Sequence, residues 1–335
     1  MSSAVLLRRR GVRHGVFAPS APASTARDAA SRWDADRPVH LPGALTPWFT
    51  PALRRSVAAC RRLFDGARRG GGLEAFVDRR LRGRADFRRG TTTVDLFDGR
   101  EIEKVHVDAL AGGRATARDL WAKLSWISVE EGDASLRLRF SFGSELLSEW
   151  SGDVARAEAA DRFAEAVLPE CAAVTPPPIR RLVARLTGGP ARFSERIVYS
   201  NAPGGGAVFH HDAEPRQLGV LYGQLFGETG WLALPKRELA EALYVHGGRG
   251  APRSVAAAMR ALDDHDRPAA DRLLNATPDF TRALVARGAF VGLRAGDALL
   301  LPSHGPDDCC WHAVFALGRT PSLAHSYGIF RARRG

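Results

Sequence analysis

Cysteine is scarce in this sequence of 335 residues, which has only Cys60, Cys171, Cys309 and Cys310. Four irregularly spaced cysteines do not make the disulfide framework of a secreted domain, so we expect reduced thiols and a cytoplasmic location. Cys309 and Cys310 are neighbours, and adjacent residues of a strand point to opposite faces. Because a second cysteine pair is also missing, the sequence argues against a zinc-thiolate site.

Long apolar runs are lacking as well. No segment has the roughly 20 apolar residues of a membrane-spanning helix, so we expect no membrane partner. The N-terminal residues MSSAVLLRRRGVRHG lack the apolar core of a secretory signal. Their arginine and serine content leaves an organelle transit peptide as an alternative. Residues 1–38 are polar and rich in Ser, Ala and Arg, and we predict that they form a disordered tail.

Lysine is nearly absent: of 48 lysine and arginine residues, only Lys104, Lys123 and Lys236 are lysines. The net charge of +11 suggests nucleic acid as a partner. The arginines are scattered along the chain, however, and no nucleic-acid-binding motif is present, so we do not expect nucleic acid to bind. An acidic partner of another kind stays open.

Residues 39–190 have the pattern of a mixed α/β region. Residues 154–168 are rich in Ala and Glu and predict a helix. Three prolines at positions 176–178 start a second predicted helix, IRRLVARL, which two glycines end. Residues 136–142, LRLRFSF, alternate between apolar and polar, as in a half-buried strand.

The sequence changes in character over residues 191–335, where short apolar segments alternate with Gly, Pro and Asp turns. The predicted strands are RFSERIVYS, the glycine-rich segment that leads into HHD, QLGVLYGQLFG, WLALP, AFVGLRAG, DALLLPS, CWHAVFAL and SLAHSYGIF. Residues from 236 to about 287 have a helical pattern instead. Short strands interrupted by one helical stretch predict an antiparallel barrel that carries a helical insertion.

Three residues in this part of the chain form a candidate metal site. His210 and Asp212 are two residues apart, so in an extended strand they share a face while His211 points away. The glycine-rich segment delivers them to the barrel, and GDALLLP precedes the strand on which His312 lies. His304 is the alternative to His312, although its Ser/Gly/Pro loop fixes its orientation less well.

Two imidazoles and one carboxylate on one face of an ion are the facial triad of non-haem Fe(II) oxygenases. This triad leaves three coordination positions open, and both a co-substrate and O2 need such positions. The mixed nitrogen and oxygen donors of His210, Asp212 and His312 suit Fe(II), although Mn, Co or Ni would also bind.

The segments GGGAVFHHD, GETGWLALP, LRAGDALLLPS and WHAVFAL resemble the JmjC/cupin-like branch of the Fe(II)- and 2-oxoglutarate-dependent oxygenases. The resemblance implies an α+β fold with a double-stranded β-helix (cupin/jelly-roll) barrel, and metal ligation by His210, Asp212 and His312. It also implies that Fe(II), 2-oxoglutarate and O2 are used to hydroxylate or demethylate a peptide, a protein side chain or a small metabolite.

The sequence departs from this family where 2-oxoglutarate would bind. The family usually has a lysine that pairs with the distal carboxylate, and Thr229 stands at that position. Arg216, Arg319 and Lys236 are candidate replacements, while Tyr222 and Ser326 are further candidates for contact with the co-substrate. Two alternatives follow: an iron oxygenase that does not use 2-oxoglutarate, and a metal-binding or regulatory module without turnover.

Overall fold

A computed structural model describes residues 4–22, 25–70, 72–97, 100–128, 130, 132–143, 152–248, 252–264 and 268–332. The fold combines helices with a large antiparallel sheet, a small one and an N-terminal two-stranded hairpin. Within the described residues, no helix is long and apolar enough to cross a membrane.

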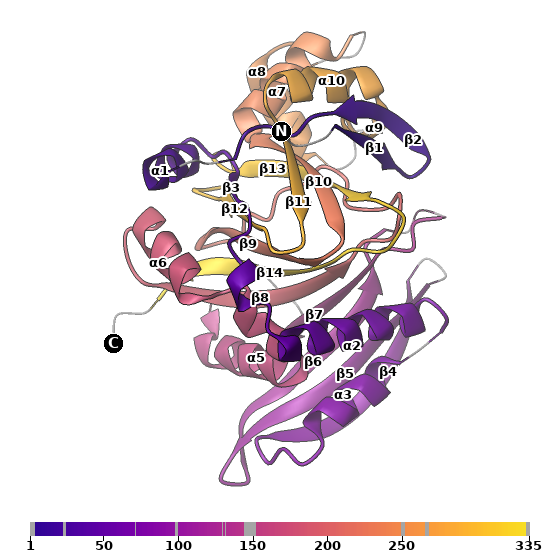
Figure 1. Cartoon of the computed structure of the whole chain (residues 1–335), viewed down its shortest axis with the longest axis vertical. Helices are drawn as coiled ribbons and strands as arrows, with labels where there is room; N and C mark the ends of the chain where they lie inside the picture. Colours follow the sequence, from indigo (N-terminus) through magenta and orange to yellow (C-terminus); the bar gives the residue numbers. More distant parts are fainter. Residues whose placement is uncertain are drawn as a thin grey trace.

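The large sheet has nine strands, which pair with their neighbours in antiparallel fashion. In spatial order the strands are β3 (Val39–Leu41), β12 (Ala298–Pro302), β9 (Gln217–Phe226), β14 (Leu323–Arg331), β8 (Ala191–Ser200), β7 (Leu136–Phe142), β6 (Arg114–Trp126), β5 (Arg100–Ala111) and β4 (Phe87–Phe97). The C-terminal strands thus continue directly into strands of the 39–190 region, through the pairing of β8 with β7 (Figure 1).

The small sheet has the order β11 (Phe290–Arg294), β10 (Glu228–Pro235) and β13 (Cys310–Leu317). It faces the β9, β12 and β14 part of the large sheet, because one apolar cluster contains side chains from both sheets. That cluster includes Tyr222 of β9, Trp231 of β10, Leu299 of β12 and Val314 of β13. The candidate metal residues lie beside this intersheet core.

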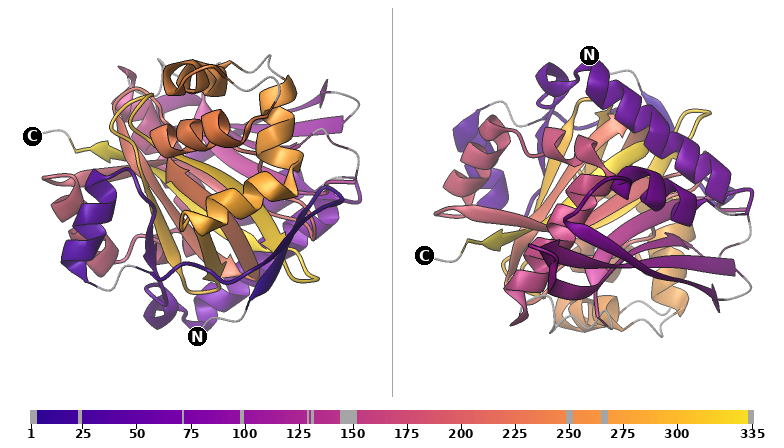
Figure 2. Two further views of the ribbon diagram at one scale, coloured as in Figure 1. Left: turned by 90° about the horizontal axis from the view of Figure 1, so that it is seen from above. Right: turned by 90° about the horizontal axis from the view of Figure 1, so that it is seen from below.

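Helices cover the outer faces of the two sheets (Figures 1 and 2). A core cluster joins the large sheet to α2 (Pro51–Ala67), α3 (Leu73–Leu81), α5 (Val154–Val167) and α6 (Pro177–Leu186). The short helices η1 (Thr46–Trp48) and η2 (Pro169–Ala173) lie in the connections. A second cluster packs the small sheet against α7 (Lys236–His246), α8 (Val255–Asp263), α9 (Pro268–Ala276) and α10 (Pro278–Ala286).

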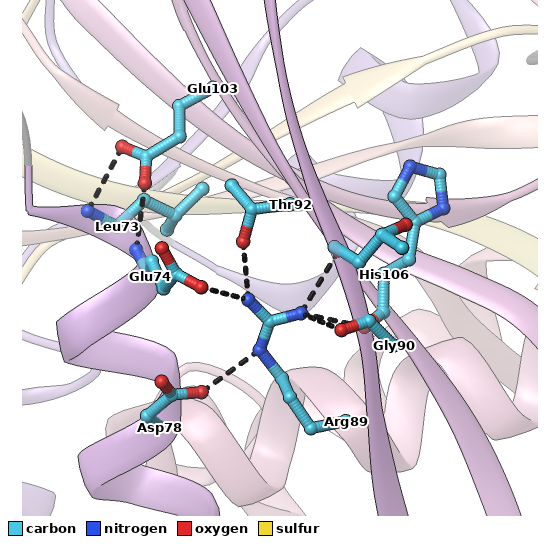
Figure 3. A network of polar contacts seen from close by, with 9 residues as sticks. Leu73, Glu74, Asp78, Arg89, Gly90, Thr92, Glu103 and His106 are labelled. Atoms are coloured by element: carbon cyan, nitrogen blue, oxygen red, sulfur yellow. Dashed lines mark hydrogen bonds and ion pairs between the residues drawn. The ribbon is translucent and has the colours of Figure 1, made fainter.

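An arginine network fixes α3 to one face of the far end of the large sheet (Figure 3). Arg89 of β4 donates to Glu74 at 2.7 Å and to Asp78 at 2.9 Å, both on α3. Glu103 of β5 accepts from the first backbone amides of α3, where a carboxylate also offsets the positive end of the helix dipole. Arg89 and Glu103 therefore mark the face of β4 and β5 that the helices cover.

The prediction of a disordered tail over residues 1–38 was wrong for the residues that the structure describes there. β1 (Val5–Arg9) and β2 (Val12–Phe17) form a hairpin, and α1 (Ala26–Asp34) follows. The polar composition hid two buried side chains: Leu7 packs in the core beneath the helical insertion, and Trp33 of α1 is also fully buried. Positions 1–3 and 23–24 lie outside the described residues.

Most of the other predicted elements are confirmed. The two helices predicted in 154–168 and after the prolines are α5 and α6, and residues 136–142 are β7. The helical pattern over 236–287 corresponds to α7–α10. The prediction failed in one detail: the segment leading to HHD is not a regular strand, and only His210 forms a β-bridge, with His312.

Candidate metal centre

His210, Asp212 and His312 come together although a hundred residues separate the first two from the third. Each offers one donor atom, and these atoms all lie within 4.8 Å of one another. Asp212 Oδ1 is 3.6 Å from His210 Nε2, and Asp212 Oδ2 is 3.5 Å from His312 Nε2. Donors bound to one ion at about 2.1 Å on adjacent octahedral positions are about 3 Å apart, so small side-chain movements would close this set on a metal ion.

The backbone of residues 205–210 is laid along β13, which aligns the two histidines. The amides of Ala316 and Val314 donate to the carbonyls of Gly205 and Ala207, at 3.0 and 2.9 Å. His210 and His312 then exchange two backbone hydrogen bonds, at 3.0 and 2.9 Å. Gly206 permits this approach because its φ is +129° and an added Cβ would lie 2.2 Å from the Val314 carbonyl oxygen.

The N-terminal hairpin holds the same segment from the other side. Arg9 donates to the Ala207 carbonyl at 2.6 Å and to Asn275 Oδ1 of α9 at 2.9 Å. Asn275 Oδ1 also accepts from the backbone amide of Phe209 at 2.8 Å. Burial, and then the neighbouring Arg10, lower the pKa of Arg9 to about 9, so it stays charged at neutral pH. Sequence inspection missed Arg9 and Asn275 because neither belongs to a motif.

The protonation of the two imidazoles favours metal binding. Nδ1 of His210 is 2.8 Å from the Val208 carbonyl, which can only accept, so the neutral ring carries its proton on Nδ1 and has the lone pair of Nε2 for a ligand. Burial, followed by the charge of nearby His210, lowers the pKa of His312 to about 3. His312 is therefore neutral near pH 7, as a metal ligand must be.

The alternative histidines do not join this cluster. The ring of His211 packs 5.1 Å from that of Trp311, and its Nδ1 accepts from the Ala213 amide at 3.1 Å. His304 lies 2.7 Å from Asp36 Oδ1 and edge-on to Trp33. His211 thus points away from the pair His210 and Asp212, as strand parity predicts.

A cavity of about 30 Å³ adjoins the candidate ligands between the two sheets. Its walls are mostly apolar or aromatic, with Ile127, Val220, Tyr222, Trp231, Leu301 and Val314. Apart from the three candidate ligands, which also line it, its polar groups are neutral and come from Tyr199, Asn201 and Ser326. Among the residues that the structure describes, no lysine or arginine lines this cavity. The side chains of His210 and Asp212 are about one third exposed, so the site opens to solvent on one side.

Four candidates for binding a co-substrate carboxylate are not among the residues that line this cavity. Thr229 is fully buried; its hydroxyl donates to Gln224 and accepts from the Trp231 indole. Lys236 is buried and ion-paired with Asp263 and Asp307, at 2.8 Å each.

The two arginine candidates are exposed. Arg319 lies in the turn after β13 and lines a separate depression with Arg8 and Arg10, while Arg216 precedes β9. Arg319, Lys236 and Arg216 thus do not line the cavity, and Thr229 lies behind its wall at Trp231. Their roles towards a co-substrate stay predictions. Tyr222 and Ser326 do line the cavity, and the buried Tyr222 hydroxyl has no hydrogen-bond partner among the described residues.

His325 of β14 lies on the face of the large sheet opposite to the cavity. Its burial predicts that the stability of the protein depends on pH. It is buried, with Nδ1 3.4 Å from Cys171 Sγ, and burial followed by Arg196 lowers its pKa to about 3. Below pH 6.5 the unfolded chain binds a proton at this residue and the folded protein does not. The contribution of neutral His325 to the free energy of unfolding is thus complete above pH 6.5, and it is lost as the pH falls from 6.5 towards 3.

We expect His325→Gln to become more stable relative to wild type as the pH is lowered. Relative to wild type, the free energy of unfolding of the variant rises by about 1.4 kcal/mol for each pH unit below 6.5, or about 2 kcal/mol at pH 5. Urea unfolding of both proteins at pH 7.5 and pH 5 measures it. The variant must be compared with wild type at each pH, because burial also raises the pKa of Glu195 to about 8. That carboxyl group makes the folded protein more stable as the pH falls, which opposes the effect of His325. Parallel pH profiles would contradict this expectation.

No protein-family model and no curated protein sequence matches this chain. Several solved structures are similar to it at low identity. One is YcfD, a ribosomal oxygenase from Escherichia coli, with 15% identity and a TM-score of 0.35 over 95% of this chain and 54% of YcfD. Another is an oxidoreductase of the 2OG-Fe(II) oxygenase family from Burkholderia pseudomallei, with 10% identity and a TM-score of 0.38 over 94% of this chain and 95% of that one.

AviO1 from Streptomyces viridochromogenes Tue57 is also similar, with 12% identity and a TM-score of 0.39 over 94% of this chain and 99% of that one. The chain spans about half the length of YcfD.

Proposed function

We propose that this protein is a non-haem Fe(II) oxygenase whose metal is held by His210, Asp212 and His312, in a barrel of the double-stranded β-helix type formed by residues 191–335. One observation carries the proposal: three donors from two distant segments converge within 4.8 Å beside an intersheet cavity. The donor set also fits the ion, because two imidazoles and a carboxylate are the facial triad of such enzymes.

Iron bound there would supply O2 activation, and the chain would supply position and shelter. Arg9 and the β-bridge to His312 hold His210 in place. Trp231 packs against His312, with ring centroids 5.3 Å apart, and would limit access of water to a bound metal from the cavity side. The exposed side of His210 and Asp212 is where a peptide, a protein side chain or a small metabolite would approach.

The residues present fit 2-oxoglutarate less well than they fit iron. Its distal carboxylate would enter a cavity whose described lining has hydroxyl and amide groups but no cation, and charge-assisted bonds are about twice as strong as neutral ones. The neutral lining favours a second candidate function, an iron oxygenase that does not use 2-oxoglutarate. All four cysteines are free and buried, which supports the further proposal of a cytoplasmic location.

Oxygen consumption by the full-length protein tests both candidates. The protein is loaded with Fe(II) under anaerobic conditions, exposed to O2 with or without 2-oxoglutarate, and assayed for succinate. Succinate formation in wild type and not in Asp212→Ala would support a 2-oxoglutarate-dependent oxygenase. Metal-dependent O2 uptake without succinate would support the second candidate. If tightly bound iron gives neither, the protein is a binding module and the oxygenase proposal fails.

A further inference from the structure

A groove of about 540 Å³ runs between α2 and α3, two of the helices that cover the large sheet (Figure 1). Each helix lines it with residues three or four positions apart, which share one helical face. On α2 they include Ala59, Arg62 and Leu63, and on α3 they include Ala75, Phe76 and Arg79. We call this recess the α2–α3 groove. It is separate from the candidate metal centre, because the two recesses share no lining residue.

Small residues keep the α2–α3 groove open above an apolar floor. Leu63 and Phe76 form the floor and are only 6% and 7% exposed. Ala59 and Ala75 stand beside them, one on each helix, and their side chains end at Cβ. The space above the floor is therefore open to a side chain of another molecule, and the floor offers it apolar contact.

The charged residues that line the α2–α3 groove all have the same sign. They are Arg62, Arg79 and Arg80, and no carboxylate of the described residues lines the groove. Arg62 and Arg79 are exposed, and within the part of the chain that the structure describes neither has an ion pair or a hydrogen bond. Both guanidinium groups are thus available to an anionic partner.

The carboxylates of the same two helices are paired with other arginines. Asp65, the one acidic residue of α2, pairs with Arg68 at 3.1 Å. Glu74 and Asp78, the two acidic residues of α3, both pair with Arg89 of β4, as Figure 3 shows. The two helices that form the groove therefore supply no carboxylate to neutralise its arginines.

Arg80 lies deeper in the groove than the other two arginines. Its guanidinium packs over the Phe76 ring, 5.2 Å from the centroid, and its buried Nη2 has no hydrogen-bond partner among the described residues. Burial raises the pKa of Glu170, while Ser56 and, more weakly, the charge of Arg80 oppose this rise. The charge of Arg80 is thus partly compensated from the core. An acceptor oxygen in the groove would satisfy the buried N–H, which is unfavourable without a partner.

We propose that the α2–α3 groove binds an acidic segment of a partner protein, with a small apolar side chain on the floor and carboxylates on Arg62 and Arg79. An arginine and a carboxylate form two parallel, charge-assisted hydrogen bonds. The lining positions 59–66 of α2 span about 10 Å, since a helix rises about 1.5 Å per residue. An extended peptide covers this length in about three to four residues. The segment is therefore a short motif in which Asp or Glu flanks an apolar residue.

Two other kinds of anionic partner fit the α2–α3 groove less well. Single-stranded nucleic acids combine phosphate contacts with bases stacked on aromatic rings, and the ring of Phe76 is almost fully buried. Binding to an anionic lipid surface also uses bulky apolar side chains that insert among the lipids. Within the described residues, α2 and α3 expose no large apolar side chain. A short acidic peptide needs only the arginines and the recess.

Fluorescence anisotropy with labelled peptides tests the proposal on the full-length protein. The peptides Glu-Glu-Val-Glu-Glu, Gln-Gln-Val-Gln-Gln and Lys-Lys-Val-Lys-Lys are compared at low and moderate salt. We expect the acidic peptide to bind at least tenfold more tightly than the neutral one, and salt to weaken its binding. Arg62→Gln and Arg79→Gln should each weaken it about fivefold. Ala75→Leu, which fills the groove with another strong helix former, should weaken it at least tenfold.

Arg181→Gln is the matched control and should change binding less than twofold. Arg181 is an exposed arginine of α6 that has no ion pair within the described residues and does not line the groove. Melting temperatures check that each variant is folded. Equal binding of the acidic and neutral peptides, or equal losses in Arg79→Gln and Arg181→Gln, would overturn the proposal. So would tighter binding of single-stranded oligo-dT or of phosphatidylserine vesicles than of the acidic peptide. The measurement needs no metal, so its result is independent of the oxygenase proposal.

Discussion

Replacing His312 by alanine is expected to abolish Fe(II) binding, with a fall in affinity of more than about 100-fold. Loss of a residue that only supports a ligand already costs 10- to 100-fold, and His312 is one of three donors. Anaerobic titration with Fe(II), or with Co(II) followed by its visible absorption, measures the affinity. His312 is buried against Trp231, so alanine also leaves a cavity, and His312→Gln provides a variant of similar volume that lacks the imidazole.

The neighbouring histidine is the control. His211 follows His210 directly and is half-buried, yet its ring packs on Trp311, so His211→Ala should bind Fe(II) within about twofold of wild type. His210→Ala should behave like His312→Ala. If His211→Ala lost the metal while His210→Ala kept it, the assignment of ligands, and with it the oxygenase proposal, would be wrong.

The candidate site could be predicted from the sequence because its signals are local. Alternation separates His210 and Asp212 from His211, and this holds although the segment has only one β-bridge. The same alternation along the chain predicted the strand on which His312 lies. Periodicity also indicated α5, α6 and β7, whose buried faces repeat at helical or strand spacing.

Contacts between distant segments could not be predicted in this way. Thr229 was expected at the co-substrate because of its position before WLALP, but Gln224 and Trp231 take both of its hydrogen-bonding roles. Arg319 was chosen for its nearness in sequence to β14, and the turn carries it outside. The continuation of β8 into β7, which joins both parts of the chain in one sheet, depends on strand order, and no single strand encodes that order.

The contacts of the N-terminal hairpin with distant segments were the hardest to predict from the sequence. Removing one of them should have a large effect on stability and metal binding. We expect Arg9→Met to lower the free energy of unfolding by about 3 kcal/mol and the affinity for Fe(II) by about tenfold. Methionine keeps most of the apolar stem but removes the bonds to Ala207 and Asn275, which leaves a buried carbonyl without its donor. Urea unfolding and metal titration measure the two effects.

The two effects have different causes, and a neighbour on the same strand separates them. Arg8 of β1 is exposed and makes no contact with the segment before His210 among the bonds described, so Arg8→Met should leave stability and affinity nearly unchanged. If Arg9→Met lowered stability but not metal affinity, the hairpin would serve the core alone. A loss of both stability and metal affinity would show that Arg9 fixes Ala207–Phe209. His210 would then be held in place by an N-terminal segment whose composition resembles that of a disordered tail.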